Sequence, residues 1–209
     1  MLPKGFVIVM LILASALPAA LAKHQVPDKY QALVARLKQG DVTVDFLEIR
    51  QAYAESPEYT DGSDTDELKA MYGAFHRKDF AEALKHSQKL LASCYLDIDA
   101  HQVAFLANRE MHVQEEAEFH HRIAQGLIQA ILKTGDGKSP ETAWTVLSTH
   151  EEYVILQVMG LTPGSQSLMH IGKHSYDKLE PVDRRTEQKV TLYFNIDASI
   201  EHLNKLFSK

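Results

Sequence analysis

The densest group of chemically capable side chains is the run His150-Glu151-Glu152-Tyr153. It combines an imidazole, two carboxyls and a phenol, which can act as base, acid and hydrogen-bond donor in hydrolysis. Asp136 lies upstream in a glycine-rich turn and completes this candidate functional cluster. No serine-hydrolase elbow, zinc-protease helix or dinucleotide fingerprint accompanies the cluster, so no catalytic residue is assigned.

The element that carries this run decides whether its two carboxyls converge. The β-rich composition of residues 153–158 predicts a strand that follows a connection at residues 149–152. Adjacent residues of a strand face opposite sides of a sheet, so Glu151 and Glu152 would diverge unless a bulge or turn redirected them. The alternative is a solvated hairpin connection without chemistry.

The turn around Asp136 has the sequence Gly-Asp-Gly-Lys-Ser over residues 135–139, which invites a phosphate-binding interpretation. A P-loop requires another glycine at position 132, which is Leu132, and it follows a strand rather than the helix expected here. We therefore expect Gly135 and Gly137 to supply left-handed backbone angles, with Asp136 accepting hydrogen bonds from amides of the turn.

Histidine is frequent in this chain, with 11 residues. Glu116 and His120 are four residues apart, so they share one face of a helix and could supply two ligands of a zinc or copper site. No tight histidine pair adds a third ligand. The sequence therefore predicts no metal site and no cofactor, and leaves Glu116 and His120 as the candidates should a metal bind.

The beginning of the chain is typical of a secretory signal peptide. Lys4 precedes a short apolar run over residues 6–14, and the small-residue step Ala20-Leu-Ala22 follows. The run is shorter than the roughly 20 apolar residues of a membrane span, so we expect cleavage after Ala22 and a periplasmic or secreted protein. After cleavage no apolar run is long enough for a span. Cys94 is the single cysteine, so the exported chain folds without an internal disulfide.

The charge composition limits the classes of molecule that this protein is expected to bind. The formal net charge is −6, and this modest acidic excess argues against nucleic acid, which requires a basic surface. The hydrophobic fraction of 45% and the charged fraction of 24% are those of an ordinary globular protein.

The hydrophobic periodicity divides the chain after the signal peptide into two regions. Residues 23–133 show helical spacing that predicts about six helices, paired at a period of roughly 33 to 38 residues, as in a helix-turn-helix repeat. A simple helical bundle is the alternative. Residues 134–209 predict an antiparallel sheet of four or five strands and a final helix. The expected class is α+β, with a helical-repeat half packed on a sheet. The predicted strands cover residues 143–147, 153–158, 167–171, 176–182 and 189–196, and the final helix covers residues 199–207.

Two resemblances add to this interpretation. The segment from Ala70-x-Tyr72-Gly73 to residues 78–84 resembles a tetratricopeptide repeat. Over most of the mature chain, the sequence also resembles exported bacterial proteins grouped as domain of unknown function 4919. The matching segments are residues 46–53, Asp79-Phe80, residues 120–127, residues 134–143, Glu151-Glu-Tyr153, Tyr176-Asp177 and residues 193–196. This resemblance implies export and a shared fold, and it transfers no catalytic residue.

These observations together predict an exported, non-catalytic module that binds a protein or peptide in the cell envelope. A tetratricopeptide-like half implies such binding only by analogy of fold. An envelope-acting hydrolase built on the carboxyl and tyrosine cluster is one alternative, and a metal-handling protein is another. The sequence leaves the partner and the oligomeric state open.

Overall fold

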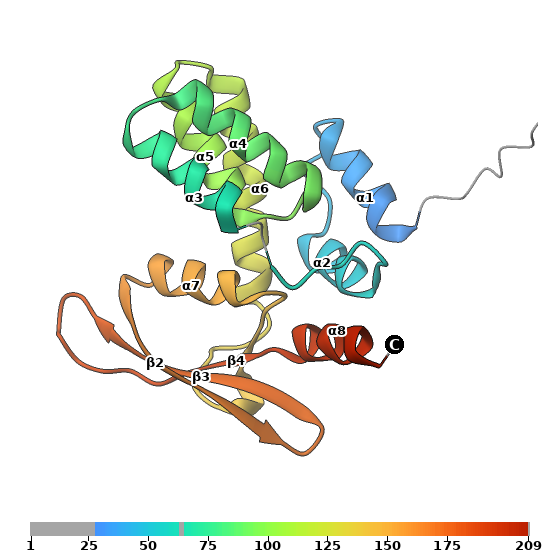
Figure 1. The fold of residues 1–209 in the computed structure, drawn as a ribbon, viewed down its shortest axis with the longest axis vertical. Helices are drawn as coiled ribbons and strands as arrows, with labels where there is room; N and C mark the ends of the chain where they lie inside the picture. Colours follow the sequence, from blue (N-terminus) through green and yellow to red (C-terminus); the bar gives the residue numbers. More distant parts are fainter. Residues whose placement is uncertain (1–27, 63–64, 209) are drawn as a thin grey trace, which may run out of the picture.

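The computed structural model describes residues 28–62 and 65–208, and in these ranges it contains eight α-helices and a four-stranded sheet (Figure 1). The helices lie mostly in the first part of the chain and the strands in the last, which confirms the α+β prediction. The predicted signal peptide at residues 1–22 lies outside the described residues. Among the helices of residues 28–62 and 65–208, none has the length and apolar character that crossing a membrane requires.

Six helices form the first part of the chain, as predicted. Four of them begin directly after an aspartate whose carboxylate accepts a hydrogen bond from an amide of the first turn, which satisfies a donor that the helix itself leaves unpaired. The helices are α1 (Lys29–Lys38), α2 (Phe46–Glu55), α3 (Thr65–His76), α4 (Phe80–Ser93), α5 (Ile98–Glu110) and α6 (Gln114–Leu132).

The packing of these helices does not confirm a tetratricopeptide-like stack. The pairs α3–α4 and α5–α6 lie next to each other, but α2 of the first pair packs against α6 instead of against α3 and α4. Gly126 of α6 permits this contact, because a Cβ there would lie 2.3 Å from the Phe46 ring of α2. As a result α1, α2 and α6 share one hydrophobic core with the sheet, while α3 and α4 contribute to a second, smaller core.

The last part of the chain forms a mixed sheet. Its strand order is β1-β4-β3-β2, and β1 runs parallel to β4 whereas the other neighbours are antiparallel. The prediction of a purely antiparallel sheet was therefore wrong at β1. Because α7, β2 and β3 lie between β1 and β4 in the chain, these two strands are not joined by a short hairpin and can run parallel. The elements are a 3-10 helix (Pro140–Thr142), β1 (Trp144–Thr145), α7 (Thr149–Val158), β2 (Leu161–Ile171), β3 (His174–Asp183), β4 (Leu192–Asn195) and α8 (Asp197–Phe207).

The predicted strand at residues 153–158 was wrong, because these residues belong to helix α7. The Ser148 hydroxyl accepts a hydrogen bond from the Glu151 amide at 3.4 Å, so serine followed three residues later by glutamate marks a helix start. The apolar run after it suits a buried helix as well as a strand, and periodicity alone does not separate the two. Residues 161–164, which lie between two of the predicted strands, are also part of β2, with an irregular register between Thr162 and Ser165.

The sheet presents one face to the core. Asp177 and Leu179 of β3 stand opposite Phe194 and Leu192 of β4, and Phe194 is fully buried. Helix α7 packs on β2 and lies between the sheet and the helices above it (Figure 1). This position brings the first turn of α7, with residues 150–153, between the two parts of the molecule.

Candidate functional site

The four residues of the predicted cluster on α7 contact different elements. His150 lies against Asp99 of α5, Glu151 pairs with Arg50 of α2, and Glu152 faces β2 and β3. The two carboxyls diverge, as the strand interpretation also expected, but the cause is the rotation of about 100° between successive residues of a helix. The first turn of α7 is therefore a junction, which we call the α7 junction. His150 and Glu151 line one small cavity of about 40 Å³, whereas Glu152 contacts the sheet.

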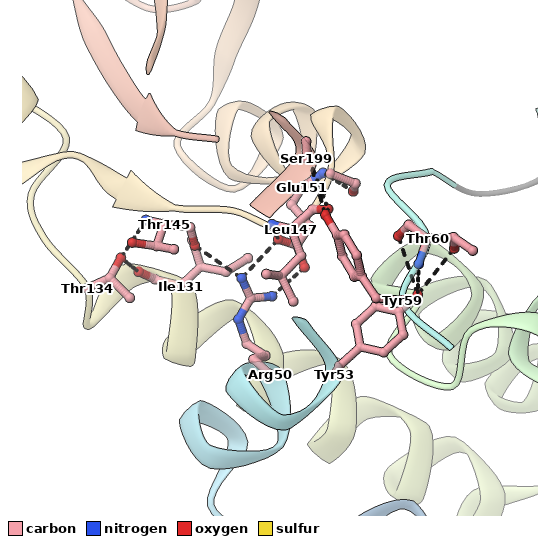
Figure 2. A network of polar contacts seen from close by, with 11 residues as sticks. Arg50, Tyr53, Tyr59, Thr60, Ile131, Thr134, Thr145, Leu147, Glu151 and Ser199 are labelled. Atoms are coloured by element: carbon pink, nitrogen blue, oxygen red, sulfur yellow. Dashed lines mark hydrogen bonds and ion pairs between the residues drawn. The ribbon is translucent and has the colours of Figure 1, made fainter. Parts of the chain in front are cut away.

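The ion pair between Arg50 and Glu151 forms the centre of the α7 junction (Figure 2). Both residues are buried, with exposed fractions of 3% and 8%. The guanidinium binds both carboxylate oxygens, one of them from Nη2 at 2.9 Å, and Nη2 also donates to the Thr145 carbonyl at 3.1 Å. The Leu147 amide donates to Glu151 Oε2 at 2.7 Å. A buried charge requires such full pairing, so this contact fixes α2 against β1 and α7.

Hydrogen bonds on both sides of the ion pair extend this connection (Figure 2). The Tyr59 hydroxyl donates to the Leu147 carbonyl at 2.6 Å, and burial raises the pKa of this phenol to about 12, so it remains a neutral donor. On the other side, the Thr145 amide donates to the Thr134 hydroxyl at 2.8 Å. That hydroxyl donates to the Ile131 carbonyl at the end of α6. The network thus joins α2, α6, β1 and α7.

Glu152 forms a buried pair with Asp177 of β3. Glu152 has no exposed surface and Asp177 is 8% exposed. The Gln166 amide of β2 bridges them, with Nε2 donating to Asp177 at 2.7 Å and to Glu152 Oε2 at 3.3 Å. Burial first, and then the Asp177 carboxyl, raise the pKa of Glu152 to about 9. Glu152 is therefore protonated at neutral pH.

This acid pair can hold and release one proton, which is the chemistry that the hydrolase hypothesis needs. Glu152 Oε1 is buried and has no hydrogen-bond partner. Tyr153 approaches the pair only indirectly, because its exposed hydroxyl donates to Gln166 Oε1 at 3.3 Å. Neither carboxyl lines the groove between α5 and α6 or the groove between α2 and α8.

The other two members of the predicted cluster lie apart from the acid pair. His150 Nδ1 is 3.2 Å from Asp99, and Asp99 also accepts a hydrogen bond from the Tyr72 hydroxyl at 2.6 Å. The hydrogen bond to Asp99 raises the pKa of His150. Asp136 is exposed and accepts from the Lys138 amide and the Thr142 hydroxyl within its own turn.

The turn around Asp136 differs from the prediction at one glycine. Gly137 has the expected left-handed backbone, with φ of +68°, whereas Gly135 is not in that region. Gly135 is required for space instead, because a Cβ there would lie 2.1 Å from the Thr142 carbonyl oxygen. The turn is thus closed by its own backbone, and Asp136 contributes to its geometry.

His120, one of the two metal candidates, contacts a second histidine. His120 Nδ1 lies 2.9 Å from His101 Nδ1, and His101 Nε2 contacts the Tyr95 carbonyl. Burial lowers the pKa of His101 to about 3 and that of His120 to about 4, so both imidazoles are neutral. Glu116 is exposed on the surface of α6. In residues 28–62 and 65–208 no three histidine, cysteine or acidic side chains are grouped to hold a metal ion.

The sequence did not predict the partners of the α7 junction, which are Arg50, Asp99, Gln166 and Asp177. A signal was present for two of them. Arg50 interrupts the apolar face of the helix at residues 46–53, and a charge in that position requires a buried acidic partner. Asp177 shares its strand face with the buried Leu179, which also places a carboxyl toward the core. Gln166 lies on an exposed strand and carries no such signal.

Two of the larger hollows in the described residues are the α5–α6 groove and the α2–α8 groove. The α5–α6 groove has a volume of about 430 Å³, and its lining residues are Gln102, Phe105, Leu106, His121, Ala124, Gln125, Ile128, Gln129 and Val158. The α2–α8 groove has a volume of about 420 Å³ and a more polar lining, which includes Arg50, Gln51, Glu55, Asp197, Glu201 and Lys205. Both volumes lie in the range typical of ligand sites.

Removing Arg50 should destabilise the fold strongly. Arg50→Ala leaves the Glu151 carboxylate buried without its charge partner, and we expect the free energy of unfolding to fall by about 3–5 kcal/mol. Arg36→Ala is the matched control, because Arg36 pairs with Asp41 at the surface, where about 0–1 kcal/mol is expected. Urea unfolding measures both variants, and equal losses would contradict the central role of the ion pair.

Glu152 should make stability depend on pH. Its pKa is raised in the folded state, so its stabilising contribution is complete below the ordinary value of 4.5 and is lost as the pH rises toward about 9. Glu152→Gln mimics the neutral acid and should remove this loss, so the variant should exceed the wild type in stability at alkaline pH. Unfolding curves across this pH window check it, with the exposed Glu115→Gln as a control expected to follow the wild type. A Glu152→Gln curve parallel to the wild type would refute it.

The chain matches no curated protein and no solved structure. The model of one protein family, described as Domain of unknown function (DUF4919), matches residues 19–205. This range contains Arg50 and Glu151 as well as the acid pair, and the description of the family assigns no activity. Since the match covers most of the chain, the protein belongs to the family of domain of unknown function DUF4919.

Proposed function

We propose that this protein is a non-catalytic peptide-binding module and that the α5–α6 groove is its binding surface. The observation that carries the proposal is the lining of this groove, which contains no Lys, Arg, Asp or Glu side chain. Its lining includes the apolar residues Leu106, Ile128 and Val158 and three glutamines.

The lining suits an extended peptide with apolar side chains. A glutamine amide both donates and accepts hydrogen bonds, which matches the N–H and C=O groups of a peptide unit. Gln125 and Gln129 are one helical turn apart on α6 and are exposed, and Gln102 stands on the neighbouring helix α5. Apolar side chains of the peptide would meanwhile be buried against Phe105 and Leu106.

The α7 junction supports the proposal by making the groove rigid. Val158 reaches the groove from the last turn of α7, and the first turn of the same helix is fixed by the ion pair of Glu151. A groove held in place before the ligand arrives loses less conformational entropy on binding. The hydrolase alternative has less support, because the Glu152 carboxyl is fully buried.

A peptide-binding experiment tests this assignment. A phage-displayed library of uncharged, apolar peptides is selected on the purified protein, and one enriched peptide is labelled for fluorescence anisotropy. Replacing both Gln125 and Gln129 by alanine should weaken its affinity about tenfold, because each lost hydrogen bond contributes about 0.5–1.5 kcal/mol.

Gln51→Ala provides the matched control, since Gln51 lines the α2–α8 groove and its loss should leave the affinity unchanged. Enrichment of no peptide, or of peptides that respond to Gln51→Ala and ignore the α6 variant, would refute the assignment.

We further propose that the protein acts outside the cytoplasm after removal of residues 1–22. The basic start, the short apolar run and the Ala20-Leu-Ala22 step support this location. Expressed from the full chain in a bacterium with two membranes, the protein should be released from the periplasm with Lys23 as its first residue by intact mass. Ala22→Trp should block the cleavage, since the exit position accepts small residues. Full-length material in the cytoplasmic fraction would contradict export.

A further inference from the structure

Strand β2 forms an unusually open edge of the sheet. The strand order places it at the end of the sheet with β3 as its neighbour, so its other side has no strand beside it in the described part of the chain. Along its 11 residues, only Leu161 is buried and only Met169 is half-buried. The β2–β3 hairpin lies at the opposite end of the molecule from α3 and α4 (Figure 1). The backbone N–H and C=O groups along this side remain available for pairing.

The charged side chains lie on the internal strand β3 and not on the edge strand β2, where proteins usually place them. Proteins protect edge strands from pairing with other chains by placing charges and proline on them. β2 contains no Lys, Arg, Asp or Glu, whereas the internal strand β3 contains Asp177, Lys178, Glu180 and Asp183. Pro163 and the irregular register beside it protect only the first part of β2. Residues 165–171 therefore form an unprotected edge.

We propose that residues 165–171 pair in antiparallel fashion with the same segment of a second copy of this chain, which joins the two sheets across a two-fold axis. Such pairing brings the central residue opposite its own counterpart, so a charge near the centre would meet an identical charge. The lack of charge in β2 is what self-pairing requires. A foreign peptide would instead be selected best by complementary charges on the edge.

The midpoint of the segment is a favourable centre for the axis. Leu168 stands there with 54% of its surface exposed, and in the dimer the two Leu168 side chains bury each other. With the axis at Leu168, Gln166 of one copy lies opposite His170 of the other, and Ser165 lies opposite Ile171. All of these pairs are neutral or hydrogen-bonding. Dimerisation would also cover Gln166, the side chain that bridges Glu152 and Asp177.

Sedimentation equilibrium from micromolar to millimolar concentration tests the proposal. The wild type should form a dimer, and Leu168→Lys should raise the dimer dissociation constant about tenfold or more, because it removes an apolar contact and places two like charges together. Leu206→Lys on α8 is the matched control: Leu206 is also an exposed leucine, at 55%, and its replacement should leave the dimer unchanged.

A charge-exchange experiment tests the two-fold pairing itself. Leu168→Glu alone should weaken the dimer as Leu168→Lys does, and an equal mixture of the two variants should recover a mixed dimer, because opposite charges then meet. Thermal unfolding of each variant verifies that it is folded. A wild type that stays monomeric, or a mixture that recovers nothing, would overturn the proposal. Either result leaves the α5–α6 groove assignment intact, since that groove does not involve β2.

Discussion

The buried ion pair between Arg50 and Glu151 is the interaction on which the arrangement of this molecule depends. Arg50 comes from the second helix and Glu151 from the start of α7, so the pair joins segments about a hundred residues apart in the chain. Both charges have been removed from water, and each finds further partners in the carbonyl of Thr145 and the amide of Leu147. This contact fixes α7 and the short strand β1 to α2, in addition to the apolar core that both elements share with the helices.

Two adjacent glutamates on α7 meet the cost of burial in different ways. Glu151 is compensated by a guanidinium, whereas Glu152 is compensated by a proton, since its neighbour Asp177 offers no positive charge. The same carboxyls that suggest acid–base chemistry in the sequence thus hold α7 to α2 on one side and to the sheet on the other. Perturbed pKa values accompany structural networks as well as catalytic sites, and here the enclosure of Glu152 favours a structural role.

The two recognition surfaces that we propose each touch an element of this junction: Val158 of α7 lines the α5–α6 groove, and Gln166 lies on the open edge of β2. The groove lies between α5 and α6, and β2 is the end of the sheet opposite β1. Both surfaces lack charged side chains in a protein with a net charge of −6. The charged side chains therefore lie elsewhere on the surface and inside the α7 junction. The α5–α6 groove and the β2 edge stay neutral, which suits contact with the backbone and apolar side chains of another chain.

The sequence alone determined the elements whose signals are local. Apolar periodicity located the six helices before residue 133, and the strands predicted at residues 176–182 and 189–196 coincide with β3 and β4. It also determined the family, since the Gly-Asp-Gly turn, the Glu-Glu-Tyr run and Tyr176-Asp177 occur in order. Helix α7 escaped prediction because the apolar run after Glu152 fits either a buried helix or a strand.

Only the tertiary structure decided the partners of the cluster. Arg50 and Asp177 meet adjacent residues of α7 from distant parts of the chain, and a single sequence carries no information on which buried charge meets which. It also decided that β1 pairs in parallel with β4 and that α2 packs on α6, because both depend on how separate elements share one core. Local chemistry specified the elements, and the burial of charge and apolar surface between them specified the site.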